Sequence, residues 1–194
     1  MEMLSDFPEA AHEVNRLALE LASHLKGGIR DTQTQIAWTL QNISLLEKFF
    51  HPRGVDCSFH GSTTGGEFLW DFIGYIKERG ILIVAESEFL TDHGEIRKDF
   101  DKLLYSSSPI KLMICRIDKK FRTQAGAKEE AERVRSDLQI DIAGSCAYYP
   151  PGSVFILYCV WWADDGKNSD FPFILQIDGE PCYRSATEKR FEPI

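Results

Sequence analysis

ILIVAESEF (residues 81–89) joins a continuous apolar run to two glutamates, and this stretch decides the fold that the sequence predicts. Four aliphatic residues in succession are typical of a strand that is buried on both faces of a sheet. Side chains alternate along a strand, so Glu86 and Glu88 are expected on the same face as Leu82 and Val84. The stretch therefore predicts two carboxylates side by side at the end of a buried strand.

The segments around this strand show the periodicities of an α/β protein. Apolar residues at helical spacing predict helices over 8–25, 31–50, 92–109 and 123–138, and apolar runs between turn residues predict strands over 55–59, 67–76, 81–89, 110–117, 153–162 and 171–177. The turn KERG (77–80) predicts an antiparallel hairpin, and the helix before 110–117 predicts a parallel crossover. The predicted fold class is α/β, with a mixed central sheet flanked by helices.

Length and composition bound the domain organisation. A chain of 194 residues with 43% hydrophobic and 27% charged residues suits one globular domain over 1–194. Within it, we expect 1–28 to form an N-terminal helix, 31–117 the core, and 118–194 a C-terminal helix with additional strands. No apolar run is long enough to span a bilayer and no signal-peptide pattern is visible, so no membrane association is expected and the expected location is cytoplasmic.

Charge and cysteine content exclude some classes of function. The net charge of −8 argues against a protein that coats nucleic acid through bulk electrostatics, although it is compatible with a local basic groove. The five cysteines lie far apart, without a CxxC pair or zinc-finger spacing, and are interpreted as reduced thiols.

A third carboxylate is expected beside the two glutamates. Asp71 lies in the predicted strand 67–76 and shares a face with Ile73 by the period-two rule. If the hairpin brings its acidic faces together, Asp71, Glu86 and Glu88 converge. Such a cluster is unfavourable without a counter-charge, and a hard cation such as Mg²⁺ or Mn²⁺ would supply that charge.

Glu47 is a further candidate from the helix predicted over 31–50. It falls on the apolar stripe formed by Ile36, Leu40, Ile43 and Phe50, where a carboxylate is costly unless it is paired or near a metal. The alternative is that Glu47, close to the end of its helix, simply reaches solvent.

The stretches FLWDF, ILIVAESEF, DFDKLL and IKLMIC together resemble the restriction-endonuclease-like, or PD-(D/E)XK, nuclease superfamily. That family has a core of helix, three antiparallel strands, helix and strand (αβββαβ), and residues 31–117 carry the resemblance. Carried over position by position, the resemblance implies that Asp71 and Glu86 are metal ligands and that Glu47 is the helical acid.

The sequence departs from the family pattern at Glu88, where the family most often has lysine. This ExE variant leaves Glu88 as a third candidate metal ligand and catalytic residue. In other branches of the family the lysine lies on the following helix, where this chain has Lys98 and Lys102. We prefer Lys102 because it lies nearer the packing face of that helix; the alternative is that both lysines only cover the surface.

The resemblance implies an Mg²⁺- or Mn²⁺-dependent endonuclease, a hydrolase that binds DNA and cleaves phosphodiester bonds. In this hypothesis Glu88 or a lysine orients or deprotonates the attacking water, and a homodimer that cuts two strands is a further hypothesis. Candidates for phosphate contact are Arg53, Lys77, Arg79, Arg97 and Lys98. The alternative function is a catalytically inactive nuclease-fold protein that acts as an interaction or regulatory module, since the ExK lysine is missing and one indole of Trp161 or Trp162 could be exposed to a partner.

Overall fold

The described residues of the protein form a seven-stranded sheet with the strand order β1-β2-β3-β4-β5-β6-β7. The computed structural model describes residues 11–59, 69–145, 153–163, 168–177 and 180–181. The strands are β1 (Asp56–Phe59), β2 (Phe72–Ile76), β3 (Gly80–Glu88), β4 (Ile110–Arg116), β5 (Val154–Trp162), β6 (Asn168–Ile177) and β7 (Glu180–Pro181). The helices are α1 (Ala11–Leu25), α2 (Gln35–Phe50), α3 (His93–Leu104) and α4 (Gln124–Ser145), with a short 3-10 helix η1 (His51–Arg53).

The sheet is mixed because its central strands run parallel and its outer strands do not. β3, β4 and β5 are parallel, whereas the pairs β1–β2, β2–β3, β5–β6 and β6–β7 are antiparallel. α3 connects β3 to β4, and α4 connects β4 to β5, so each parallel pair is joined by a crossover helix. The predicted hairpin, the crossover and the mixed sheet flanked by helices are confirmed.

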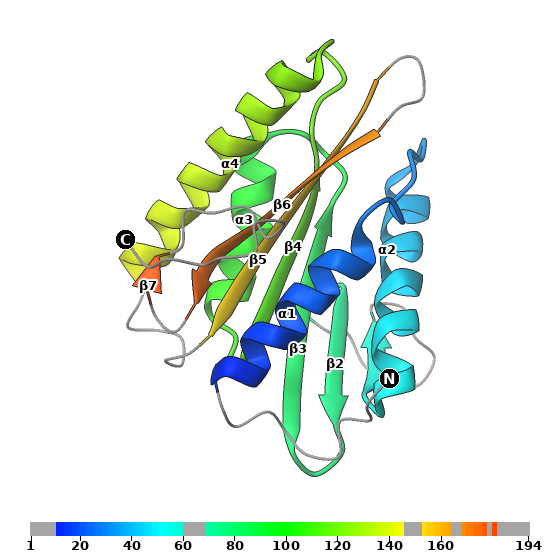
Figure 1. Ribbon diagram of the computed structural model, residues 1–194, viewed down its shortest axis with the longest axis vertical. Coiled ribbons are helices and arrows are strands. Elements are labelled where there is room, and N and C mark those ends of the chain that lie inside the picture. The colour runs from blue at the N-terminus through cyan, green and yellow to red at the C-terminus, as the bar shows by residue number, and fades with distance from the viewer. Residues whose placement is uncertain (1–10, 60–68, 146–152, 164–167, 178–179, 182–194) are drawn as a thin grey trace.

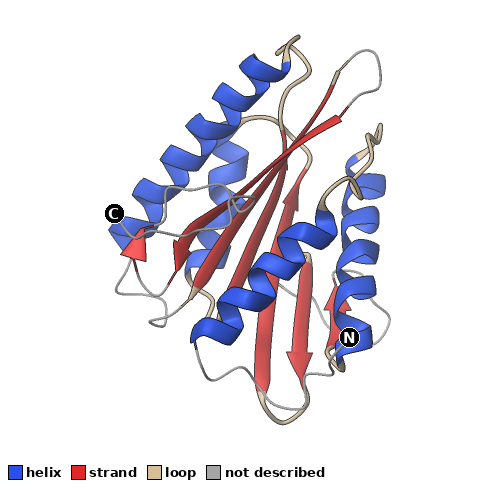
Figure 2. Ribbon diagram, viewed as in Figure 1, coloured by secondary structure: helices blue, strands red, loops and turns tan. Residues whose placement is uncertain are grey.

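The helices form one layer on each side of the sheet (Figures 1 and 2). α1 and α2 pack on one face around residues such as Leu21 and Trp38. α3 and α4 pack on the other face around residues such as Phe100 and Leu138. We call these the α1/α2 face and the α3/α4 face. The thin apolar stripe that predicted α4 is buried as expected, at Ala127, Ala131, Val134 and Leu138.

A β-bulge in β3 determines which side chains meet α3. Tyr75 pairs with Ile81 and Gly74 with Ile83, so Leu82 is the extra residue on β3. Leu82 therefore packs on the α1/α2 face, whereas Val84 packs on the α3/α4 face. The expectation that Leu82 shares the face of the two glutamates is wrong, because the bulge reverses the alternation. After the bulge the alternation is regular, and Glu86 follows Val84 onto the α3/α4 face.

The buried stripe of α2 differs from the predicted one. The helix begins after the N-cap Thr34, whose hydroxyl accepts a hydrogen bond from the Ala37 N–H at 3.2 Å. Ile36 and Leu40 are 74% and 54% exposed, although the sequence predicted them in the core. The buried residues of α2 are Trp38, Asn42, Ile43, Leu46, Phe49 and Phe50. The difference buries Trp38 and Phe49 in place of Ile36 and Leu40, and these aromatic side chains remove more apolar area from water.

β5 is buried along its whole length because it lies between β4 and β6 and is covered on both faces. Trp161 and Trp162 are 4% and 5% exposed, so the strand is buried on both faces as its continuous apolar run favours, and neither indole is available to a partner. Trp162 packs edge-on against Trp38, with ring centroids 5.8 Å apart.

The register between β2 and β3 leaves no room for a side chain at Gly74. A Cβ atom added there would lie 2.7 Å from Cγ2 of Ile83 and 3.2 Å from Cγ1 of Val55. We expect Gly74→Ala to lower the free energy of unfolding by about 1–3 kcal/mol, as overpacking does. Gly144→Ala in α4, where a Cβ would meet nothing within 4 Å, should instead stabilise by up to about 1 kcal/mol. Urea unfolding of the wild type and both variants measures these changes. Equal free energies of unfolding in the two variants would contradict the close packing at Gly74.

Among the described helices, none is long and apolar enough to cross a membrane.

Candidate functional site

Asp71 and Glu86 lie opposite each other where β2 begins and β3 ends. Phe72 pairs with Ala85, which places Asp71 at the level of Glu86. The backbone N–H of Ser87 donates to Oδ2 of Asp71 at 3.0 Å and holds that carboxylate against β3. Asp71 itself precedes the first residue of β2, so the prediction that it lies within the strand is wrong by one residue. The predicted proximity of Asp71 and Glu86 is nevertheless present.

Glu86 is a buried carboxylate with an incomplete set of partners. Its side chain is 2% exposed, and its Oε1 atom has no hydrogen-bond partner among the described residues. Burial raises the pKa of Glu86 to about 9; the negative charge of Asp71 adds to this rise, and Lys102 opposes it. A carboxylate in this position favours either a proton or a cation beside it.

Lys102 on α3 provides a cation close to Glu86. Its Nζ lies 3.5 Å from both Glu86 oxygens, with hydrogen-bond geometry to Oε2, and 2.6 Å from Oδ1 of Asp99. Desolvation lowers the pKa of Lys102, but the hydrogen bond to Asp99 and the charge of Glu86 outweigh it and raise the pKa overall. The indole N–H of Trp70 donates to the Lys102 carbonyl at 3.1 Å, which ties the residue before Asp71 to the end of α3.

The two candidate lysines on α3 have different surroundings. Lys98 is 69% exposed and pairs with Glu95 one turn away on the same helix. Lys102, at 35% exposure, turns toward β3. Lys102 therefore lies nearer the packing face than Lys98, as expected, and its catalytic role stays a prediction.

Glu88 lies on the same face as Glu86 but makes different contacts. Its Oε1 accepts a hydrogen bond from the Leu90 N–H at 2.6 Å, and its carboxyl group hydrogen-bonds Asp99. Burial raises the pKa of Glu88 to about 7; the hydrogen bond to Asp99 adds to the rise, and the Leu90 N–H opposes it. The predicted convergence of three acids is thus corrected to one pair, Asp71 with Glu86, and a second pair, Glu88 with Asp99.

The structure does not bring Glu47 to these residues. α2 covers the α1/α2 face, whereas Glu86 faces α3 on the other side of the sheet. Glu47 lies 3.8 Å from the His51 imidazole, and its side chain is 32% exposed. Its charge acts on Cys57 of β1, whose pKa rises to about 12 through burial and then through Glu47. The alternative that Glu47 reaches solvent describes its position better than the role of a helical acid.

The basic residues predicted for phosphate contact do not surround this site. Arg53 donates to the Phe49 carbonyl and pairs with Glu20 on the α1/α2 face. Arg97 pairs with Asp141 of α4. Lys77 and Arg79 lie in the turn between β2 and β3, at the end of the hairpin away from Glu86.

Asp71 and Glu86 fit a magnesium or manganese ion as a pair of protein ligands. Among the described residues, no three His, Cys, Asp or Glu side chains are arranged to hold a metal ion together. Mg²⁺, however, often uses only one or two carboxylates and completes its shell with waters and substrate phosphate oxygens. Asp71 and Glu86 would supply two such carboxylates, and the Oε1 atom of Glu86 accepts no hydrogen bond from any residue that the structure describes.

Two features of the site were missed by sequence reasoning. Asp99 lies three residues before Lys102, a spacing that puts both on one side of α3 and could have been found from helical periodicity. Asn42 of α2 donates from Nδ2 to the Ser87 hydroxyl at 2.9 Å through a buried contact. Asn42 thereby helps to hold the end of β3. No local signal pointed to Asn42, because the predicted apolar stripe of this helix did not include it.

No protein-family model matches this sequence, and no curated protein is significantly similar to it.

Proposed function

We propose that this protein is a metal-dependent nuclease that hydrolyses phosphodiester bonds of nucleic acid, with DNA as the expected substrate. The observation that carries the proposal is the environment of Glu86. It is a buried carboxylate opposite Asp71 and 3.5 Å from the Lys102 ammonium, and its Oε1 atom accepts no hydrogen bond within the described part of the chain. A purely structural glutamate would be expected to have both oxygens hydrogen-bonded.

The order of elements supports the same proposal. From α2 to β4 the chain runs helix, three antiparallel strands, helix and strand, and the acids lie at the adjoining ends of the second and third strands. This is the arrangement that the resemblance to the restriction-endonuclease-like superfamily implies. It supports Asp71 and Glu86 as the metal-binding pair.

The residues of the site have distinct proposed roles. Asp71 and Glu86 would hold Mg²⁺ or Mn²⁺, which when bound supplies a Lewis acid for the scissile phosphate and for water. Lys102, whose Nζ lies 3.5 Å from Glu86, would place a positive charge beside the substrate phosphate. Glu88, held by Asp99, is the candidate that orients the attacking water.

Cleavage of supercoiled plasmid in Mn²⁺ tests the proposal. The wild-type protein should cut, and Asp71→Asn should cut at least about a hundredfold more slowly, because a metal ligand is lost. Asp56→Asn, at an exposed position on β1, is the matched control and should cut like the wild type. Equal cutting by Asp71→Asn and the wild type would mean that another site or a contaminant is responsible.

Isothermal titration with Mn²⁺ separates a nuclease from an inactive module of the same fold. Heat that is present in the wild type and strongly reduced in Asp71→Asn supports the nuclease. No heat in either protein, together with no cleavage, would favour the interaction module.

A further inference from the structure

Asn42 is a buried polar side chain in an apolar layer. It lies on α2 and is 1% exposed, and the other buried residues of that helix are aromatic or aliphatic. Its Oδ1 atom accepts no hydrogen bond from the residues that the structure describes. Burying an amide in this way costs free energy that an apolar residue of similar size would avoid. This cost draws attention to the contact that Asn42 makes with β3.

That contact joins α2 to the end of β3. Nδ2 of Asn42 donates to the Ser87 hydroxyl at 2.9 Å. Ser87 is 6% exposed and lies between Glu86 and Glu88, but its side chain points to the α1/α2 face because side chains alternate along a strand. Asn42 therefore holds, from the opposite face of the sheet, the segment whose two glutamates face α3.

The backbone of Ser87 extends the link to Asp71. β2 begins at Phe72, so beyond that residue β2 no longer continues the ladder along β3. The Asp71 carboxylate continues it instead, because its Oδ2 atom accepts from the Ser87 N–H at 3.0 Å. On its other side β3 stays paired with β4 as far as its last residue. The position of the Ser87 N–H thus determines where the Asp71 carboxylate lies relative to Glu86.

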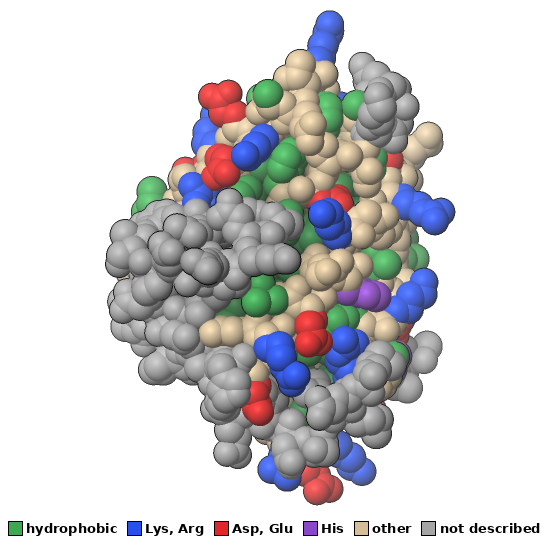
Figure 3. Space-filling model, in the orientation of Figure 1, with side chains coloured by type: hydrophobic (Ala, Val, Ile, Leu, Met, Phe, Trp, Pro, Cys, Tyr) green, Lys and Arg blue, Asp and Glu red, His purple; other side chains and the backbone are tan. Residues whose placement is uncertain are grey.

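Asn42 itself lies away from the candidate metal site. It is covered by α2, on the face of the sheet opposite the contact between Glu86 and Lys102. Over the described part of the α1/α2 side, acidic and basic side chains are interspersed (Figure 3). A mixture of signs does not attract a polyanion as a basic groove would. Asn42 is therefore expected to act through Ser87 and not by contact with a substrate or an ion.

From these contacts we infer that Asn42 is a positioning residue, which through Ser87 holds the Asp71 carboxylate opposite Glu86 for metal binding. The inference rests on the proposed function, because it concerns the same pair of candidate metal ligands. Loss of a residue that holds a metal ligand in place typically lowers metal affinity by about 10- to 100-fold.

Amide hydrogen exchange in EDTA tests the link without a metal ion. Asn42→Ala should speed exchange of the Ser87 N–H about tenfold relative to the amides of β4, because the end of β3 loses a contact and opens locally. A variant that is merely less stable overall would speed exchange in β4 as well.

Gln41→Ala is the matched control for Asn42→Ala. Gln41 is the neighbouring amide on α2, and it exchanges two hydrogen bonds with the backbone of Arg30, at 3.0 and 2.7 Å. Its loss removes a tie between α2 and another segment, but that tie does not lead to β3. Exchange of the Ser87 N–H should therefore stay at the wild-type rate in Gln41→Ala.

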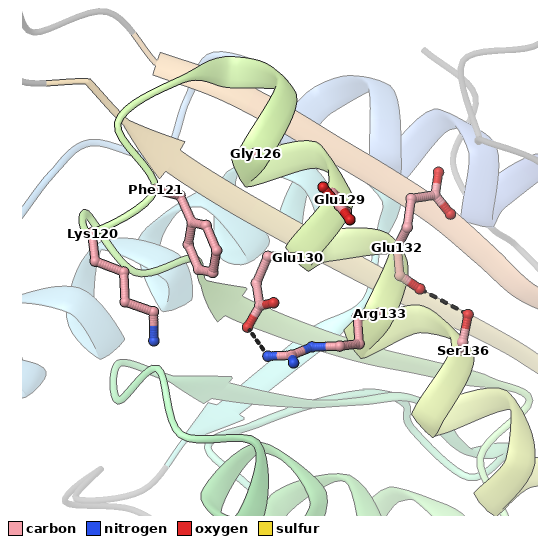
Figure 4. A pocket seen from close by; sticks show the side chains of 8 residues that line it. All are labelled: Lys120, Phe121, Gly126, Glu129, Glu130, Glu132, Arg133 and Ser136. Atoms are coloured by element: carbon pink, nitrogen blue, oxygen red, sulfur yellow. Dashed lines mark hydrogen bonds and ion pairs between the residues drawn. The ribbon is translucent and has the colours of Figure 1, made fainter.

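Isothermal titration with Mn²⁺ measures the consequence for the metal site. Asn42→Ala should raise the Kd for Mn²⁺ about tenfold. Ser87→Ala should do the same, and the double variant should bind no more weakly than either single variant, since both changes break one contact. Ser136→Ala is the control for removal of a serine hydroxyl: on α4 this hydroxyl donates to the Glu132 carbonyl at 2.9 Å (Figure 4), and its loss should leave Kd unchanged.

The outcomes separate this inference from the proposed nuclease activity. Unchanged exchange at Ser87 in Asn42→Ala, or an equal increase in Gln41→Ala, would overturn the link even if the protein cuts DNA. Faster exchange together with wild-type Mn²⁺ affinity would overturn the role in metal binding. If the faster exchange is confined to Asn42→Ala but the wild type binds no Mn²⁺, the link to Asp71 stands and only the nuclease proposal fails.

Discussion

Glu86→Gln is expected to slow Mn²⁺-dependent DNA cleavage by at least about 10³-fold, as loss of an essential catalytic charge does, and at the same time to stabilise the metal-free protein. The amide keeps the size of the side chain but cannot carry the charge that holds a cation. Activity and stability should therefore change in opposite directions, which a variant that merely misfolds would not show.

The stabilisation by Glu86→Gln should grow as pH rises, because the pKa of Glu86 is raised in the folded wild type. The group ionises near pH 4.5 in the unfolded chain and near 9 in the folded protein without metal. Between these values the folded protein retains a proton that the unfolded chain has released. The free energy of unfolding of the wild type therefore falls as pH rises, by up to about 1.4 kcal/mol per unit, and Glu86→Gln does not share this loss.

Urea unfolding in EDTA at pH 6 and pH 8.5 measures this difference, and Glu13→Gln on the exposed side of α1 is the control. Mn²⁺ at about 100 times Kd should then stabilise the wild type by about 2.7 kcal/mol and leave Glu86→Gln unchanged. A Gln variant that shows wild-type pH dependence would contradict the buried, proton-binding state of Glu86. A Gln variant that Mn²⁺ still stabilises would contradict its role as a metal ligand.

Lys102→Met is expected to slow cleavage by about 10² to 10³-fold while Mn²⁺ binding is retained, because the ammonium acts on the substrate and not on the ion. In the metal-free protein the same change should raise the pKa of Glu86 further, since Lys102 is the charge that opposes the shift.

Lys98→Met is the matched control for Lys102→Met. Lys98 lies on the same helix, is 69% exposed and pairs with Glu95, so its loss should leave cleavage near the wild-type rate. If Lys98→Met impaired cleavage and Lys102→Met did not, the assignment of the helical lysine would be reversed. Single-turnover cleavage rates at saturating Mn²⁺ measure both variants.

Local sequence patterns determined the type and order of the elements. The apolar run before Glu86 predicts a buried strand, KERG predicts the hairpin, and Asp92 predicts the start of α3. The structure has the strand and the hairpin, and the Asp92 carboxylate caps α3 by accepting from the Gly94 N–H at 2.8 Å. These signals are local because a strand or a helix end is specified by the residues within it.

The placement of Asp71 directly opposite Glu86 depends on the β-bulge at Leu82, because the unshifted register of the Ile76–Gly80 pair would put Asp71 opposite Ala85. The position of the Glu88 side chain was likewise decided by the tertiary structure. Its carboxylate pairs with Asp99 of α3, and this depends on where α3 packs over β3.

The tertiary structure alone decided which stripe of α2 is buried and on which side of the sheet Glu47 lies. Two apolar stripes run along α2, and packing of Trp38 against Trp162 and Phe89 selects the one that leaves Ile36 exposed. Periodicity within a helix identifies its apolar faces, but burial depends on the neighbours each face meets.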